Sequence, residues 1–323
     1  MNPEALSPVL VTGATGQVGQ RLVGTLIAQG LGVTVLTRAP ERAQALWPGD
    51  AVRFHRGDLT DPSSLVGLGN GIHTVLHLAS HHPGPHEPDL YGAPGHWQVS
   101  AEGTTHLLGA LTAAPIERLV YVSSVRADTH DTLYGRAKRA AEQQILAFGE
   151  QRGIKASVLR LPMVYGLDGT GNLERLVRAI AAGRFPPWPR LAQRRSAIHV
   201  EDAISALLLL ASHPATGGQV YVATDGQAYS TRWIYEQTLR ALGRPLPSWT
   251  LPGWALRLAA EAGTFAERVL KRRMPLTREA LAKLTQDAWY KDEGLRALGF
   301  AARWDLESEI RRLVRGFGPA SAP

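Results

Sequence analysis

The first half of the chain alternates short apolar runs with amphipathic segments. Helix-like spacing of apolar residues occurs in 16–29 and again in 102–113. β-Branched and other apolar residues dominate the runs PVLVTG, GVTVLTR, AVRFHRGD, IHTVLHLAS, ERLVYVSSV and KASVLRL. Strands and helices that take turns with short connections predict an α/β fold built on a doubly wound parallel sheet.

The second half follows a looser pattern. After Gly166, the stretches PPWP and RPLP indicate irregular turns. We expect SAIHV at 196–200, a helix over 201–212 and the strand QVYVA to rejoin the main sheet, and the rest to form a smaller, mostly helical lobe. The predicted division is a larger domain of residues 1–166 plus 196–225 and a smaller lobe of residues 167–195 plus 226–323.

Composition and charge narrow the classes of function. Of the 323 residues, 44% are hydrophobic and 20% charged, and the absence of cysteine excludes disulfides, thiolate nucleophiles and cysteine-ligated zinc. Neither a signal-peptide pattern nor an apolar run of about 18 residues occurs, so we expect a cytoplasmic protein. The net charge of +7 includes one strong basic cluster, Lys271–Arg273, without a nucleic-acid-binding motif. We expect no nucleic-acid partner; contact with a membrane surface stays open, as does the choice between monomer and homodimer.

Candidate chemistry begins at a glycine-rich turn. Residues 12–19 read TGATGQVG, directly after an apolar run and at the start of a helical pattern. Backbone N–H groups at a helix N-terminus can bind a dinucleotide pyrophosphate, and glycine lets the backbone approach the phosphates because a Cβ would collide with them. The alternative is a helix start whose glycines serve only close packing. We interpret the larger domain as a Rossmann-like dinucleotide-binding domain with cofactor contacts from Gly13, Thr15, Gly16, Gln17, Val18 and Gly19.

The end of the second predicted strand indicates which dinucleotide binds. An acid at this position binds the 2′-hydroxyl of the adenosine ribose, whereas an arginine accommodates a 2′-phosphate. This strand ends in Thr37 and Arg38 without a carboxylate. NADP(H) therefore fits better than NAD(H), because a guanidinium binds phosphate through charge-assisted hydrogen bonds. The alternative is an exposed arginine with no ligand.

Further motifs follow in an order typical of one enzyme family. They are Gly57-Asp58-Leu59, His77-Leu78-Ala79-Ser80, Gly103-Thr104, Ser123-Ser124, Tyr134-x-x-x-Lys138, Arg160 with VYG at 164–166, and HVED at 199–202. With the glycine turn, they make most of residues 8–225 resemble the extended short-chain dehydrogenases/reductases, the NAD-dependent epimerase/dehydratase superfamily. The C-terminal part is nearest the dihydroflavonol reductase and 3β-hydroxysteroid dehydrogenase-like branch.

This resemblance implies roles for particular side chains. Tyr134 would donate a proton to a carbonyl oxygen, Lys138 would bind the nicotinamide ribose, and Ser124 would hydrogen-bond the substrate oxygen. A tyrosine with a pKa of about 10 becomes a usable acid or base when a nearby cation stabilises its phenolate, and Lys138 would supply that cation. Two exposed neighbours on a helix would show the same spacing. Further cofactor contacts are implied for Asp58 at the adenine amino group, for Pro162 and Val164 at the nicotinamide carboxamide, and for Leu59, Leu78, Ala79 and Ser80.

Three positions depart from the family pattern. The helix position that usually carries Asn lies in VSAEGT and offers Ser100, which puts a water-relay role in doubt. The proline of the usual Arg-Pro pair is displaced, giving RLP. Only nine residues separate Ser124 from Tyr134, and this short loop predicts a more open substrate side.

Two other segments have more than one interpretation. A proline-broken loop, HHPGPHEPD, holds several of five clustered histidines, so we predict a solvated or substrate-facing loop and no metal site; the five are His77, His81, His82, His86 and His96. In 253–273, four large apolar residues recur near helical spacing, namely Trp254, Leu258, Phe265 and Val269. Core packing explains such a stripe most often, while the rim of an apolar substrate site or a patch lying on a membrane stays open.

The sequence thus predicts an NADP(H)-dependent oxidoreductase that interconverts a ketone or aldehyde and an alcohol on a mainly apolar small molecule bound by the smaller lobe. One alternative is a sugar-nucleotide epimerase or dehydratase, whose diphosphate Arg194 and Arg195 could bind. The segment SSVRAD lacks the acid pair that dehydratases place after the serine. The other alternative is a non-catalytic NADP-sensing regulator, which has no need for the serine, tyrosine and lysine.

Overall fold

The chain divides into two compact units. The structure is a computed structural model and describes residues 6–83, 91–129, 132–167, 171–270, 274, 276–285 and 287–317. The first unit contains the chain up to Leu161 together with Ala203–Ala223 and Asp292–Phe300. The second contains Pro162–Asp202, Thr224–Lys291 and the chain from Ala301 onward. The main difference from the predicted division is Asp292–Phe300, which the sequence pattern assigned to the smaller lobe.

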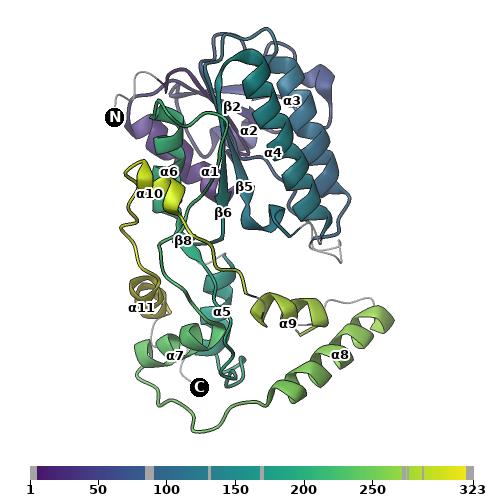
Figure 1. Cartoon of the computed structure of the whole chain (residues 1–323), viewed down its shortest axis with the longest axis vertical. Helices are drawn as coiled ribbons and strands as arrows, with labels where there is room; N and C mark the ends of the chain where they lie inside the picture. The colour runs from purple at the N-terminus through teal and green to yellow at the C-terminus, as the bar shows by residue number, and fades with distance from the viewer. Residues whose placement is uncertain are drawn as a thin grey trace. The chain divides into compact units, whose positions relative to one another are not determined.

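A seven-stranded parallel sheet forms the middle of the first unit. Its strand order is β3-β2-β1-β4-β5-β6-β9, and the direction of winding reverses between β1 and β4. Figure 1 shows α1 (Gln17–Ala28) and α6 (Val200–Ser212) on one side of the sheet and α3 (Gly103–Leu111) and α4 (Leu133–Arg152) on the other. The predicted Rossmann-like, doubly wound fold is confirmed. The strands are β1 (Val9–Thr12), β2 (Val33–Thr37), β3 (Val52–Arg56), β4 (Thr74–His77), β5 (Arg118–Ser124), β6 (Lys155–Leu161) and β9 (Val220–Val222).

The inner strands are apolar because helices cover both faces of the sheet. Helix α4 packs on β5 and β6 through small or branched residues at every fourth position, Ala137, Ala141 and Ile145, each fully buried. At Gly149 the helix comes so close to β6 that a Cβ would lie 2.3 Å from the Ala156 Cβ. The start of α4, which carries the Tyr-x-x-x-Lys motif, is therefore held against the ends of these strands. Shorter elements of this unit are α2 (Pro40–Gln44), the 3-10 turns η2 (Pro62–Leu65) and η4 (Val125–Ala127), the π-helix η3 (Trp97–Glu102) and α10 (Glu293–Ala297).

The second unit is mostly helical, as the sequence pattern indicates. Its helices are α5 (Asn172–Ala181), α7 (Thr231–Ala241), α8 (Gly253–Leu270), α9 (Arg278–Thr285) and α11 (Leu306–Gly316). Helices α5, α7 and α11 share a core with Tyr165 and Ala197. Within the described residues, no helix is both long and apolar enough to cross a membrane.

One predicted strand pairs differently from the expectation. The segment SAIHV forms β8 (Ala197–His199), which pairs with β7 (Met163–Tyr165) in a separate two-stranded parallel sheet. Only β9 joins the main sheet, where it occupies the place beside β6. The physical reason is that Pro162, which has no N–H group to donate, interrupts the chain between β6 and β7, and the short strand after it takes β8 as its partner.

Candidate active site

The glycine turn lies at the point where the winding of the sheet reverses. Gly13 has a φ of +70°, and a Cβ there would lie 2.7 Å from backbone atoms of Leu78 and Ala79, which follow β4. A Cβ on Gly19 would lie 2.3 Å from the Gly13 carbonyl oxygen. Gly16 is the N-cap residue of α1, and no side chain caps this helix end. This turn, in which glycines let backbone segments come close together, fits a dinucleotide pyrophosphate. Such a group accepts hydrogen bonds from the backbone N–H groups at a helix N-terminus. The intervening Thr15, Gly16 and Gln17 are exposed, and Val18 is partly buried.

A buried histidine ties this turn to the neighbouring strand. His77, at the end of β4, contacts the Thr12 hydroxyl through Nδ1 at 2.6 Å and the Thr104 hydroxyl through Nε2 at 3.0 Å. The Thr12 hydroxyl also accepts a hydrogen bond from the Ala79 N–H at 3.2 Å. Burial, together with the positive charge of Lys138, lowers the pKa of His77 to about 3, so the ring is neutral. His77 therefore has a structural role at the end of β4.

Arg38 and Asp58 face each other beyond the ends of β2 and β3. Arg38 Nη1 lies 3.9 Å from Asp58 Oδ2, and the Arg38 side chain is 80% exposed. Asp58 Oδ1 also accepts hydrogen bonds from the Thr60 N–H at 2.9 Å and the Thr60 hydroxyl at 2.8 Å, which fixes the carboxylate. Because the contact is exposed, it holds Arg38 only weakly. The guanidinium is thus free to meet an anion at this edge of the sheet.

The predicted catalytic side chains come from two neighbouring elements. Ser124 is the last residue of β5, and Tyr134 and Lys138 lie on the first turns of α4. Thr132 caps this helix by accepting a hydrogen bond from the Gly135 N–H at 3.1 Å. The Tyr134 and Ser124 side chains are hydrogen-bonded to each other. The structure therefore places the serine beside the tyrosine in the same unit.

Lys138 points toward the sheet. Its Nζ donates to the Val122 carbonyl oxygen at 3.2 Å and lies 4.9 Å from the centre of the Tyr121 ring. Burial lowers the pKa of Lys138 to about 8, while the Glu142 carboxylate acts in the opposite direction. The side chain is 3% exposed, so it is not one of two solvated neighbours on a helix surface.

Three residues that the sequence did not single out for chemistry surround Tyr134. The Tyr91 carbonyl accepts a hydrogen bond from the Tyr134 N–H at 2.9 Å, and the Arg126 guanidinium lies 4.3 Å from the centre of the Tyr91 ring. The rings of His96 and Tyr134 meet edge to face, with centroids 5.0 Å apart. Burial raises the pKa of Tyr134, against the hydrogen bond with Ser124 and the charge of Arg126. The cation that favours the phenolate in this structure is thus Arg126.

A buried ionic network fixes α4 on the sheet. Glu142, one turn after Lys138, accepts two hydrogen bonds from the Arg160 guanidinium on β6, at 2.8 and 2.7 Å, and one from the Ser123 hydroxyl at 2.6 Å. Arg160 also pairs with Asp128. A bidentate arginine–carboxylate pair is directional, so this network sets the position of the helix that carries the tyrosine and lysine.

The other predicted site residues lie in several places. Leu59 and Ala79 are buried, Leu78 is partly buried and Ser80 is exposed, all just beyond the ends of β3 and β4. Pro162 and Val164 are partly buried and belong to the second unit. Ser100 is buried within the π-helix η3, where its carbonyl accepts from the Thr104 hydroxyl at 2.5 Å. Among the clustered histidines, His81 and His96 meet edge to face at 5.2 Å, His82 is exposed, and His86 lies outside the described residues.

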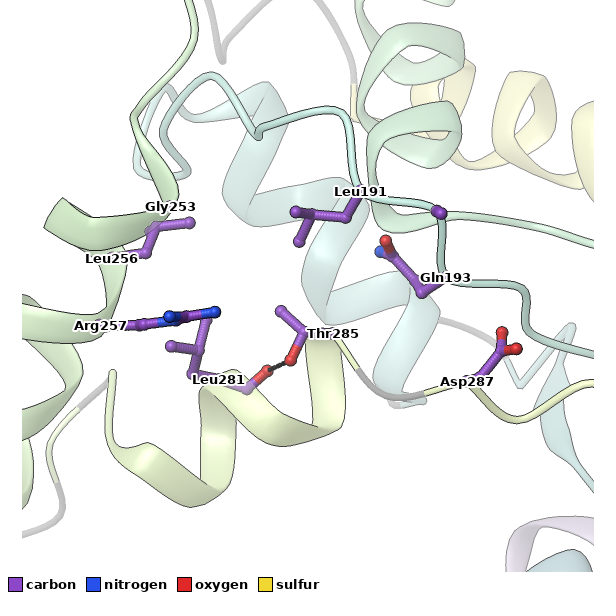
Figure 2. Close-up of a pocket in the computed structure, with 9 residues that line it drawn as sticks. Leu191, Gln193, Gly253, Leu256, Arg257, Leu281, Thr285 and Asp287 are labelled. Atoms are coloured by element: carbon purple, nitrogen blue, oxygen red, sulfur yellow. Dashed lines mark hydrogen bonds between the residues drawn. The ribbon is translucent and has the colours of Figure 1, made fainter.

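A separate pocket of about 500 Å³ lies in the second unit. Figure 2 shows the Arg257 side chain extending from α8 toward the middle of this pocket. Gln193 lines it from the segment before β8 and donates through Nε2 to the Leu284 carbonyl oxygen at 3.0 Å. This volume is within the range of small-molecule sites. The lining residues are Leu191, Ala192, Gln193, Gly253, Leu256, Arg257, Leu281, Thr285 and Asp287.

A glycine cradle at the turning point of a parallel sheet, with a serine, tyrosine and lysine beside it, defines a dinucleotide-binding enzyme of the short-chain dehydrogenase/reductase class. The model of the NAD dependent epimerase/dehydratase family matches residues 9–223, and the chain belongs to this family. The predicted membership of the extended short-chain dehydrogenase/reductase superfamily is thereby confirmed. Members of this family are enzymes that act on small molecules.

Reductases and epimerases are both among the relatives. The chain is 29% identical to the 4-hydroxy-2-methyl-3-oxo-4-farnesyl-3,4-dihydroquinoline-1-oxide ketoreductase of Stigmatella aurantiaca, over 96% of each chain. It is 23% identical to the UDP-glucose 4-epimerase of Vibrio cholerae, over 77% of this chain and 80% of that protein. The solved structure of MoeE5 in complex with UDP-glucose and NAD is 25% identical, covers 97% of this chain and 99% of its own, and gives a TM-score of 0.68.

Proposed function

We propose that the protein is an NADP(H)-dependent reductase that converts a ketone or aldehyde on a mainly apolar molecule to the alcohol. The observation that carries this proposal is the set of Ser124, Tyr134 and Lys138, in which Tyr134 is hydrogen-bonded to Ser124 and its pKa is raised by burial. A phenol that stays protonated is suited to donate a proton. Reduction is therefore the direction that this arrangement favours.

Each side chain of the site would have a separate role in the reduction. A bound nicotinamide cofactor supplies a hydride to the carbonyl carbon. Ser124 hydrogen-bonds the carbonyl oxygen, and Tyr134 donates its hydroxyl proton to that oxygen as negative charge develops on it. Arg126 provides a positive charge near the phenolate that remains, and Lys138, one turn along α4, is assigned to the nicotinamide ribose.

The choice of NADP(H) rests on Arg38. The guanidinium stands at the end of β2 with 80% of its side chain exposed, and Thr37 and Arg38 leave that end without a carboxylate. A 2′-phosphate would bind the guanidinium through charge-assisted hydrogen bonds. The MoeE5 structure holds NAD, so the two cofactors must be compared directly.

The proposed substrate class is based on the relatives and on a pocket in the second unit. One relative matched over nearly its whole length is a ketoreductase whose named substrate carries a farnesyl group. The second unit, to which we assign substrate binding, has a pocket with Leu191, Leu256 and Leu281 in its lining. These leucines suit the apolar part of a carbonyl compound, and the same lining carries the charged Arg257 and Asp287.

Sugar-nucleotide epimerase or dehydratase activity is the second candidate, because MoeE5 binds UDP-glucose and the Vibrio relative is an epimerase. Binding a diphosphate needs several cationic donors. Arg194 is one of the two arginines that the sequence offers as donors to a diphosphate. Its guanidinium lies 4.9 Å from the centre of the Trp289 ring and 3.8 Å from Asp287. The contact with Asp287 is exposed, as is that of Arg38 with Asp58, so it does not decide between the two candidates. The intact serine, tyrosine and lysine disfavour a non-catalytic sensor.

The test is a kinetic comparison of hydrophobic ketones and aldehydes with UDP- and dTDP-sugars, with NADPH and with NADH. We expect higher kcat/KM on the apolar carbonyls and tighter binding of NADPH. Arg38→Ala should weaken NADPH binding about 10- to 100-fold, the worth of about one charge-assisted hydrogen bond, and leave NADH unchanged. Arg42→Ala, at an exposed arginine nearby, is the control. Turnover of a nucleotide sugar alone would move the protein to the second candidate, and cofactor binding without any turnover would favour the sensor.

A further inference from the structure

Helix α8 has two apolar faces, and only one of them is buried. Leu256 and Ala260, one turn apart, are 2% and 1% exposed. On the opposite face, large apolar side chains recur at spacings of about one and two turns, which aligns them in one stripe along the helix. These are Trp254, Leu258, Phe265 and Val269, with 68%, 62%, 71% and 62% of each exposed. We call these four residues the α8 stripe.

The buried side of α8 is already occupied by α9. Glu261 pairs with Arg278 of α9 at 2.5 Å, and the Thr264 hydroxyl accepts from the Arg278 N–H at 2.9 Å. A Cβ on Gly263 would lie 1.8 Å from the Leu276 carbonyl oxygen, so the backbones are in direct contact here. Figure 1 shows α9 beside α8 in this unit. Helix α8 is therefore attached to its own unit through residues outside the stripe.

The interpretation as core packing, which the sequence pattern favoured, is thus wrong for these four residues. Single exposed apolar residues are common on protein surfaces, but a contiguous stripe of aromatic and aliphatic side chains marks an interaction surface. Tryptophan at one end and phenylalanine toward the other are the residues that amphipathic helices insert at a membrane interface.

Charge indicates what the stripe contacts. Residues 253–273 contain five basic side chains against two acidic ones, Glu261 and Glu267. Arg257 lines the pocket, which leaves Arg268 and the consecutive Lys271, Arg272 and Arg273 as the basic residues outside it. The pairing of Glu261 with Arg278 neutralises one of the acids. A second copy of the chain would bring an equal excess of positive charge against this one, whereas an anionic surface would attract it.

We propose that the α8 stripe docks on the surface of an anionic lipid membrane, with its apolar side chains among the acyl chains, and that the excess of positive charge in this part of the sequence attracts the headgroups. Hydrophobic insertion and electrostatic attraction add in such binding. The helix lies along the surface, and the rest of the unit faces the water. This proposal is independent of the reaction that the protein catalyses.

The test is co-sedimentation of the full chain with vesicles of phosphatidylcholine alone and of phosphatidylcholine containing phosphatidylserine. We expect stronger binding to the anionic vesicles and a loss of that difference at high salt, because salt screens the attraction. Phe265→Ser and Leu258→Ser should each weaken binding roughly tenfold, since each removes one large apolar side chain from the bilayer. Arg268→Glu should weaken binding to the anionic vesicles and leave the weaker binding to phosphatidylcholine in place.

The control is Val66→Ser, because Val66 is 79% exposed in the first unit and a general loss of surface apolarity would affect it equally. Circular dichroism of each variant checks that the fold is kept; these positions are exposed, so the substitutions leave no cavity. Equal binding of Phe265→Ser, Leu258→Ser and the wild type overturns the proposal. So does a dimer in lipid-free buffer that Phe265→Ser dissociates, because the stripe would then be the interface between two copies.

Discussion

Tyr134 is the residue on which the proposed chemistry depends. We expect Tyr134→Phe to lower kcat at least about 100-fold, because general acid catalysis contributes 10²–10⁴-fold, and to leave NADPH binding close to that of the wild type. The ring and its contacts with His96 stay in place in this variant. The measurement is steady-state kinetics together with a fluorescence titration of NADPH. Activity above about a tenth of the wild-type value would mean that another group donates the proton.

The lowered pKa of Lys138 predicts how the reaction rate depends on pH. Burial lowers the pKa of Lys138 to about 8, so the side chain is cationic below that pH and loses its charge as the pH rises through it. We expect kcat/KM for reduction to fall above about pH 8, by up to tenfold per pH unit. Activity that remains in Lys138→Arg should not decline there, because arginine keeps its charge. A decline that persists in this variant would assign the titration to a different group.

At the residue scale, the sequence predicted the residues whose spacing is fixed within one element or at one strand end. Tyr134 and Lys138 are four apart on one helix, and Ser124 ends the preceding strand. Tyr91 and His96 were not assigned to the reaction, because they are distant from Tyr134 in the chain and only the fold brings them beside it. Arg126, in η4 between Ser124 and α4, was not assigned either, because a single arginine in a short turn has no characteristic spacing. The spacing of these three residues along the chain carries no signal of their place beside Tyr134.

At the scale of elements, the position of α4 depends on its buried ion pair with β6. Glu142 and Arg160 have 2% and 7% of their side chains exposed, so the loss of Glu142 leaves the buried Arg160 charge with the more exposed Asp128 as its ion-pair partner. We expect Glu142→Gln to lower the free energy of unfolding by about 3–5 kcal/mol. The control is Glu307→Gln, which removes an exposed pair with Arg311 on α11 and should cost less than about 1 kcal/mol. Equal losses in the two variants, measured by urea unfolding, would contradict a structural role for the network.

The strands were easier to predict from the sequence than their partners. Apolar runs locate β1, β2, β4, β5 and β6 because these strands are buried on both faces. The three residues of β8 have the same apolar character whichever strand they pair with, so the pattern did not reveal that β7 is the partner. For α8, the periodicity predicted an apolar stripe, but it did not distinguish which of the two apolar faces is buried.

At the scale of the whole molecule, the order of segments along the chain does not show which segments form the same compact unit. The segment Asp292–Phe300 returns to the first unit after the chain has built most of the second. There Gly294 comes so close to β9 that a Cβ would lie 3.3 Å from the Tyr221 ring. A contact between residues so far apart in the chain leaves no local pattern, which is why the sequence placed this segment in the other lobe.

The two units should respond to acid in opposite ways. His77, in the first unit, has its pKa lowered by burial from 6.5 to about 3. Between these values the unfolded chain binds a proton that the folded chain does not, so acid destabilises this unit through His77, by up to about 1.4 kcal/mol per pH unit. Asp225, in the second unit, has its pKa raised by burial from 3.8 to about 6. Here the folded chain binds the proton, and the stability that Asp225 contributes is present at low pH and lost as the pH rises through about 6.

Urea unfolding followed between about pH 4 and pH 7 separates these effects. Relative to the wild type, His77→Gln should lose less stability on acidification, because glutamine cannot take up the proton and can still hydrogen-bond Thr12 and Thr104. Asp225→Asn should lose more, because it lacks the group that binds a proton in the folded state; the hydroxyls of Tyr165 and Tyr229 can still donate to its amide oxygen. A pH dependence that neither substitution changes would show that other groups control the acid response.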